Sequence, residues 1–89
     1  MFKCPRIHSV EVIDNFILLV KFENQEQRIY DVSRLLEKEM FAPLKNPVFF
    51  KSFTVDTGGY AVIWNEDLDI SEYELWKNGT VPVGQPSNP

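Results

Sequence analysis

Apolar side chains alternate with other residues along the first third of the chain, a pattern typical of β-strands. The alternation runs through residues 7–14, 16–23 and 27–32, and short polar segments separate these stretches. The middle stretch is apolar on both faces, so its strand is expected to be central or covered on both sides. Asp14 and Asn15 form the expected first turn. Because the connections are too short for crossovers, the three strands predict an antiparallel meander.

The alternation gives way to a helical spacing in the middle of the chain. Residues 33–40 carry an apolar stripe and predict a short helix, which ends before Pro43 because the residue preceding proline avoids helical backbone. Asn46-Pro47 predicts an N-cap and the first position of a second helix of one or two turns. Phe49 and Phe50 cannot both face inward from this helix, so one of them is expected to be partly exposed.

A hairpin is predicted in the second half of the chain. Residues 53–56 and 60–64 form its two strands, and Gly58-Gly59 supplies a turn in which positive φ costs no steric strain. The second of these strands is again apolar on both faces. Residues 65–69 are mostly polar and acidic, and they predict a loop.

The last predicted element is a short helix capped by Ser71. Ser71 and Glu74 have the spacing of a capping box, in which the hydroxyl accepts a backbone N–H and the carboxylate reaches back to the cap. Gly79 is expected to end the helix. The chain is therefore predicted to be a single α+β domain over residues 1–81, followed by a flexible C-terminal tail at 82–89. The domain is expected to contain an antiparallel sheet of about five strands, a three-strand meander plus a hairpin, with about three short helices.

The composition of the chain excludes several classes of protein. A hydrophobic fraction of 44% and an aromatic fraction of 13% supply a core, which excludes intrinsic disorder for most of the chain. No apolar run approaches the roughly 20 residues that span a bilayer. The net charge of −4 argues against nucleic-acid binding through this domain alone. With a single cysteine, Cys4, and no apolar leader at the N-terminus, the expected location is the cytoplasm.

The acidic segment after Trp64 is the strongest candidate for a metal site, but it lacks two of the residues that a calcium-binding loop requires. Asn65, Asp67 and Asp69 have the alternating spacing that begins a calcium-binding loop. The next position is Ile70, where glycine is needed for the sharp turn, and a tryptophan takes the place of the bidentate glutamate. Solvated carboxylates are therefore the favoured interpretation.

Cys4 and His8 lie four residues apart and have the spacing of half a zinc site. The chain contains no second cysteine or histidine, so a tetrahedral site cannot close within it. No nucleophile and base are selected by spacing either, so neither catalytic residues nor a metal or cofactor is predicted.

An ordered set of residues from Pro5 to Trp76 resembles a known family. The residues that carry the resemblance are Pro5-Arg6-Ile7, Phe16-Ile17-Leu18-Leu19-Val20-Lys21-Phe22, Arg28-Ile29-Tyr30-Asp31-Val32, Leu35-Leu36, Phe41-Ala42-Pro43-Leu44, Gly58-Gly59, Val62, Trp64, Asp69-Ile70, Glu72 and Trp76. In this order they resemble the small bacterial family catalogued as domain of unknown function 2442.

The resemblance implies a small α+β domain with antiparallel strands and short helices, and no established catalytic residues. It also implies that some members are encoded beside another small protein, an arrangement proposed to be toxin–antitoxin-like. Family members often place an Asn-Gly turn after the tryptophan, whereas this chain has Asn65-Glu66-Asp67-Leu68.

The surplus of apolar residues indicates the function better than any polar motif. If short helices and loops leave part of it exposed, the exposed patch marks a protein interface. We therefore predict a non-enzymatic protein-interaction module, an antitoxin-like component of a small two-gene system, with aromatic residues that bind a partner and acidic residues that steer it. A protein partner or self-association is expected, and no membrane. The predicted interaction residues are Phe41, Phe49, Phe50, Trp64, Asp67, Asp69, Tyr73 and Trp76.

A small ligand-binding or enzymatic domain is the alternative. It would use a pocket around the acidic loop 65–69, lined by Trp64, Asp67, Asp69 and Tyr73. A deep concave pocket would favour this alternative, whereas an apolar patch or a symmetric dimer would favour the interaction module.

Overall fold

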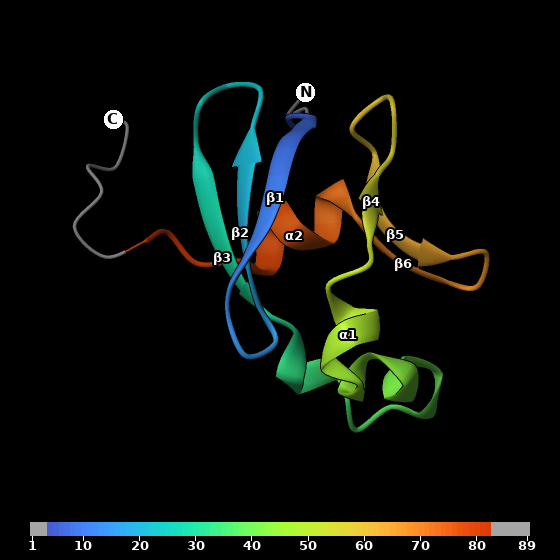
Figure 1. The fold of residues 1–89 in the computed structure, drawn as a ribbon. Helices are drawn as coiled ribbons and strands as arrows, with labels where there is room; N and C mark the ends of the chain where they lie inside the picture. Colours follow the sequence, from blue (N-terminus) through green and yellow to red (C-terminus); the bar gives the residue numbers. More distant parts are fainter. Residues whose placement is uncertain (1–3, 83–89) are drawn as a thin grey trace.

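The chain folds into two three-stranded antiparallel sheets and several short helices, which a computed structural model describes over residues 4–82 (Figure 1). The strands are β1 (Ile7–Asp14), β2 (Ile17–Phe22), β3 (Gln27–Asp31), β4 (Thr54–Val55), β5 (Ala61–Asn65) and β6 (Leu68–Ser71). The helices are the 3₁₀ segments η1 (Val32–Leu35) and η2 (Glu39–Lys45) and the α-helices α1 (Pro47–Phe50) and α2 (Glu72–Asn78). The α+β class is confirmed, as is the meander of β1, β2 and β3.

The strands form two sheets, where the sequence predicted one. The orders are β1-β2-β3 and β4-β5-β6, and all pairs are antiparallel. The two sheets meet where the Ile7 N–H donates to the Gly59 carbonyl, at 2.9 Å, so the turn between β4 and β5 touches β1 without forming a ladder with it. α2 contacts β3 of one sheet and β6 of the other, and Figure 1 shows it between them.

The sixth strand corrects the prediction of a loop at 65–69. Leu68 and Ile70 are buried while Asp69 and Ser71 are exposed, so the segment alternates with the period of a strand. The Asn65 side chain accepts the N–H of Asp67 at 2.8 Å, which closes the turn that joins β5 to β6. The strand escaped the sequence prediction because it is short and follows a run of acidic residues.

The predicted helix at 33–40 is replaced by the two 3₁₀ segments. Asp31 caps η1, because its carboxylate accepts the N–H of Ser33 at 2.9 Å. Pro43 lies inside η2, where the prediction ended the helix. Helix α1 was predicted correctly at its start: the Asn46 side chain accepts the N–H groups of Val48 and Phe49.

The core collects apolar side chains from both sheets and from the helices between them. Its buried members are Ile7, Leu18, Val20, Phe22, Tyr30, Val32, Leu44, Phe50, Val62, Trp64, Leu68, Ile70 and Leu75. The Trp64 indole donates a hydrogen bond of 2.8 Å to the Phe50 carbonyl and stacks on the Phe50 ring, with centroids 5.9 Å apart. Phe49 is only partly buried, so the expectation that one member of the Phe49–Phe50 pair faces outward is confirmed.

The turn between β1 and β2 lies one residue later than predicted. Asp14 pairs with Ile17, so the turn residues are Asn15 and Phe16. Phe16 has φ 58°, which is uncommon for a bulky residue. Its ring packs edge-on against Phe50 at 5.3 Å between centroids, so a core contact holds this backbone in place.

Two further observations complete the fold. Within residues 4–82, no helix is long and apolar enough to cross a membrane. The predicted flexible tail at 82–89 falls outside the described residues from position 83 onward.

Candidate functional site

A groove with a volume of about 350 Å³ lies beside β6, between this strand and the chain that runs from η1 into η2. Its lining residues are Leu35, Lys38, Phe41, Asp69, Ile70, Ser71 and Glu74. The groove therefore gathers residues from two segments about 30 positions apart in the sequence. Two of the predicted interaction residues, Phe41 and Asp69, lie in it.

Some backbone N–H and C=O groups of β6 point away from β5, on the side of the strand where the groove lies. The Glu72 N–H donates to the Tyr60 carbonyl at 2.9 Å, and Ile70 pairs with Val62. Residues on an antiparallel strand direct their peptide groups alternately toward and away from the neighbouring strand. Ile70 therefore faces β5, whereas the N–H and C=O of Asp69 and the N–H of Ser71 point away from β5, to the open edge of the sheet.

The other long edge strands are at least partly hydrogen-bonded on their outer sides. Ile29 of β3 exchanges two hydrogen bonds with Thr80, at 2.7 and 2.8 Å. Ile7 of β1 donates to Gly59. The remaining edge strand, β4, is two residues long. An edge strand with unpaired peptide groups is a template for pairing with another chain. Within residues 4–82, β6 presents such groups beside the groove, and β1 beyond Ile7 is a second open edge.

The charges around the groove are mainly acidic. Asp69 is exposed, and Glu74 is partly buried, while Lys38 is the basic residue among the lining groups. The Glu74 carboxylate accepts 2.6 Å and 2.9 Å hydrogen bonds from the Tyr30 hydroxyl and the Asn78 amide. Burial raises the pKa of Tyr30 well above its usual value, and the hydrogen bond to Glu74 raises it further.

These contacts change the capping prediction for α2. The Ser71 hydroxyl accepts the N–H of Glu74 at 3.1 Å, as predicted. The Glu74 carboxylate accepts hydrogen bonds from Tyr30 and Asn78 and not from the backbone of Ser71, so the prediction of the reciprocal half of the capping box is wrong. Gly79 ends the helix as predicted, with its N–H bonded to the Leu75 carbonyl at 3.0 Å.

The remaining predicted interaction residues lie in several environments. Phe50 and Trp64 are in the core and present almost no surface, with exposed fractions of 2% and 8%. Asp67 is exposed in the turn before β6, and Tyr73 is 53% exposed on α2. Phe49 packs on the core from α1. These residues therefore do not form one continuous site with the groove.

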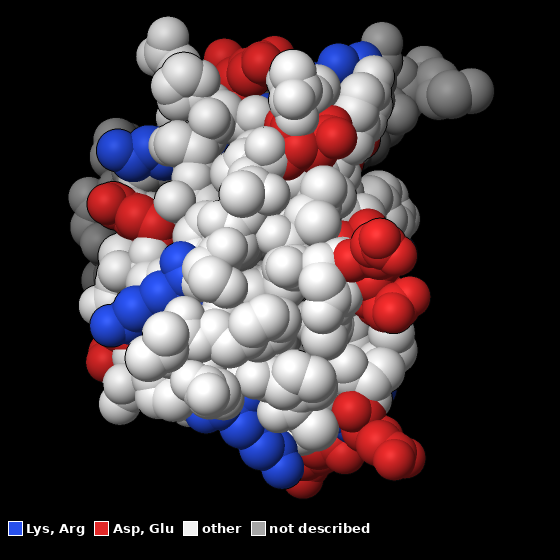
Figure 2. Space-filling view, turned by 45° about the vertical axis from the view of Figure 1, so that its right-hand side comes forward, with Lys and Arg blue, Asp and Glu red and all other residues white. Residues whose placement is uncertain are grey.

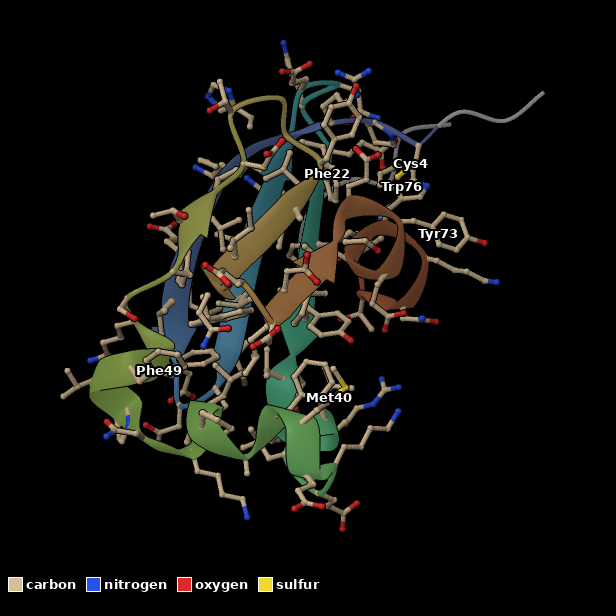
Figure 3. All side chains as sticks on the ribbon, turned by 90° about the vertical axis from the view of Figure 1, so that its right-hand side faces the viewer. Cys4, Phe22, Met40, Phe49, Tyr73 and Trp76 are labelled. Atoms are coloured by element: carbon tan, nitrogen blue, oxygen red, sulfur yellow. The ribbon has the colours of Figure 1, made fainter. Side chains whose placement is uncertain are left out.

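Trp76 is also a packing residue. Its ring meets Phe22 edge-on at 5.2 Å between centroids, and the Arg28 guanidinium lies 3.9 Å from its centroid. Figure 3 shows Trp76 beside Phe22 and Tyr73 pointing outward from α2. Much of the surface of Trp76 is thus used within the fold.

Sequence reasoning missed most of the groove. The missed lining residues are Leu35, Lys38, Ile70, Ser71 and Glu74. The alternation of Leu68 and Ile70 with polar residues could have identified β6. No local signal places residues 35–41 beside that strand, because this contact arises from the packing of distant segments.

A second cavity, of about 280 Å³, lies between the β1–β2 turn and α1. Its lining residues are Val12, Ile13, Asp14, Asn15, Phe16, Pro47, Phe50 and Lys51. The Asn15 N–H already donates to the Asp14 carboxylate at 2.7 Å, and Phe16 and Phe50 pack on each other. Much of the side-chain lining of this cavity is therefore occupied by contacts within the protein.

No group of three or more His, Cys, Asp or Glu side chains within residues 4–82 is arranged to hold a metal ion. Burial raises the pKa of the Cys4 thiol, and the Glu72 carboxylate raises it further, so the thiol stays protonated at neutral pH. The β6 groove instead offers backbone hydrogen bonds, apolar walls and acidic charge.

The two antiparallel meanders, with short helices between and below them, define a small α+β domain. The chain belongs to the family described as protein of unknown function DUF2442, whose family model matches residues 7–80. This match confirms the resemblance on which the sequence prediction relied. No curated protein and no solved structure gives a significant match to the chain.

Proposed function

We propose that this protein is a non-enzymatic protein-interaction module of the bacterial cytoplasm, and that it is the antitoxin-like component of a small two-gene system. The observation that carries the interaction role is the β6 groove, where peptide groups of an edge strand have no backbone partner within residues 4–82 and lie beside apolar walls. The two-gene role rests on the family resemblance alone, which implies that some members are encoded beside another small protein.

Exposed apolar side chains near the groove support the proposal. Met40, which follows the groove residue Lys38 by two positions, is 60% exposed, and Tyr73, next to Glu74, is 53% exposed. Figure 3 shows Met40 below α2 and Tyr73 projecting outward from it, on the same side of the molecule. Large apolar side chains grouped near a concave surface are typical of protein interfaces.

The distribution of charge favours a basic partner. The net charge is −4, and both Asp69 and Glu74 line the groove. Figure 2 shows a broad area without charged side chains, bordered by acidic groups along its right margin and by both acidic and basic groups along its left and lower margins. Such an arrangement steers a partner by charge and leaves the uncharged area for contact, so association should weaken as salt increases.

The alternative of a ligand pocket around 65–69 gains no specific support. Trp64 is buried in the core, and neither Asp67 nor Tyr73 is among the residues that line the β6 groove. Of the four residues invoked for such a pocket, Asp69 lies in the groove. The four therefore do not converge on that cavity.

The test is affinity purification of the tagged full chain from its native host at low and moderate salt. Wild type is compared with Met40→Glu, and Val48→Glu is the matched control because Val48 is 80% exposed on α1. We expect wild type and Val48→Glu to recover one basic protein in stoichiometric amount, and Met40→Glu to recover about tenfold less, since a charge then replaces an apolar contact. Recovery of no stoichiometric protein by wild type would refute the interaction role.

The antitoxin role has its own test. Expression of the recovered partner alone should slow growth of the host, and co-expression of this chain should restore it. A partner that leaves growth unchanged would retain the interaction role and remove the antitoxin role.

A further inference from the structure

We propose that the β6 edge binds an extended segment of the partner protein as an added strand, and that this segment carries an apolar residue flanked by basic residues. This inference rests on the proposed function and specifies how the partner is recognised. Strand addition obtains its affinity from backbone hydrogen bonds and its specificity from alternate side chains.

The backbone of β6 supplies the hydrogen bonds. Asp69 presents an N–H and a C=O, and Ser71 presents an N–H, on the side of the strand away from β5. These groups have the spacing with which an antiparallel or parallel strand pairs, since alternate residues face the same edge. Thr80 bonds to the outer side of β3, whereas Gly59 bonds to β1 at Ile7 alone, so β6 and the rest of β1 are open edges within residues 4–82. Of these two edges, β6 has the groove that combines the apolar side chains of Leu35 and Phe41 with the acidic Asp69 and Glu74.

The two faces of β6 specify which side chains the added strand carries. Ile70 points into the protein, and the side chains of Leu35 and Phe41 form the wall of the groove next to it. A residue of the added strand that faces inward therefore contacts apolar groups. Its neighbours face outward, because side chains on a strand alternate, and they lie beside the exposed Asp69 side chain.

Acidic groups make the outward-facing position selective for a basic residue. Asp69 is exposed on the outer face, and Glu66 and Asp67 are exposed in the turn that precedes the strand. Lys38, on the other wall, is the basic group that lines the groove. Opposite charges on directly facing strand positions attract, so Lys or Arg is favoured beside Asp69.

The experiment begins with a phage-displayed library of random 12-residue peptides selected on the full chain. Synthetic versions of the enriched peptides are then titrated by NMR against the isotope-labelled wild type and against Asp69→Pro. Proline removes the N–H that faces the open edge without removing a bond to β5, and proline is tolerated on edge strands. Asp69→Asn is the matched control, because it keeps the N–H and removes the charge.

We expect basic and apolar residues to alternate in the selected peptides. We also expect these peptides to slow hydrogen exchange at the amides of Asp69 and Ser71. Asp69→Pro should weaken binding about tenfold or more, because the facing peptide carbonyl loses its donor. Asp69→Asn should weaken binding about two- to threefold at low salt, and the difference should vanish at high salt. An N-methyl group on the peptide at the residue facing Asp69 should abolish binding, which tests the pairing without altering the protein.

Each of the following results would overturn the proposal. Peptides that bind Asp69→Pro as well as wild type, or an N-methylated peptide that binds unchanged, would exclude backbone pairing at this edge. Protection of the Asp69 amide that depends on protein concentration, without peptide, would make a second copy of the chain the occupant. A native partner that binds Asp69→Pro normally would leave the interaction module intact and place the contact elsewhere, whereas a wild-type chain with no partner would refute the proposed function itself.

Discussion

The hydroxyl of Tyr30 donates a hydrogen bond of 2.6 Å to the Glu74 carboxylate and so joins β3 of the first sheet to α2. Tyr30 is 3% exposed, and its ring belongs to the core. The two residues are 44 positions apart in the sequence, so the bond also links the two halves of the chain. Glu74 is therefore both a wall of the groove and a structural partner of a buried hydroxyl.

Removal of the Glu74 side chain should destabilise the protein more than loss of a surface cap would. Glu74→Ala leaves the buried Tyr30 hydroxyl without its acceptor, and we expect a loss of about 1–3 kcal/mol in the free energy of unfolding. Tyr30→Phe removes the donor and should cost about 1 kcal/mol. Urea denaturation of both single variants and the double variant measures their coupling, and additive losses would show that the bond contributes nothing.

The raised pKa of Tyr30 predicts a loss of stability at high pH. The folded protein holds the hydroxyl protonated above its usual pKa of 10.0, whereas the unfolded chain releases the proton there. The folded state therefore binds more protons than the unfolded state, and the free energy of unfolding falls as pH rises above about 10. Denaturation at pH 9 and pH 11 should show a smaller fall for Tyr30→Phe than for wild type, and equal falls would contradict the assignment.

The elements that could be predicted from the sequence are those specified by local patterns. Strands β1 to β3 follow from alternation and short turns, and α1 from Asn46 and Pro47. Strand β6 was missed because its alternation covers only four residues, of which Asp69 and Ser71 also suit a loop. Over four residues, the alternation that predicts a strand and the polar residues that predict a loop are equally strong evidence.

The groove could not be predicted because it depends on contacts between distant segments. Phe41 and Asp69 were selected as an aromatic and an acidic residue, and nothing in the sequence places them in one cavity. Glu74 shows the same limit: its spacing from Ser71 predicts a cap, but packing brings Tyr30 to its carboxylate. Division of the strands into two sheets likewise depends on where the Gly59 turn meets β1.

Trp64 should prove to be one of the costliest residues to truncate. It is 8% exposed, stacks on Phe50, meets Phe53 edge-on at 5.8 Å and donates to the Phe50 carbonyl. Trp64→Ala should lower the free energy of unfolding by about 3–5 kcal/mol. Trp64→Phe keeps a ring but leaves the carbonyl without its donor, so its loss should be smaller. Thermal and urea denaturation check both values, and a loss well under about 1 kcal/mol for Trp64→Ala would place the ring outside the core.

The contact between the two sheets predicts that the two glycines of the β4–β5 turn respond differently to alanine. Gly59 has φ 77°, and a Cβ atom there would lie 2.7 Å from the Ile7 carbonyl oxygen, so both the backbone conformation and the approach of β1 oppose a side chain. At Gly58 the nearest atoms, at 2.6 and 2.8 Å, belong to the ring of Tyr60, which is 50% exposed and can move aside.

We therefore expect Gly59→Ala to lower the free energy of unfolding by about 2 kcal/mol or more, and Gly58→Ala by less than about 1 kcal/mol. Hydrogen exchange at Ile7 distinguishes the cause, because its N–H donates to the Gly59 carbonyl. If the strain lies at the junction of the sheets, Gly59→Ala accelerates exchange at Ile7 and Gly58→Ala does not. Equal losses for the two variants, with unchanged exchange at Ile7, would mean that the turn and β1 are not packed as closely as the geometry requires.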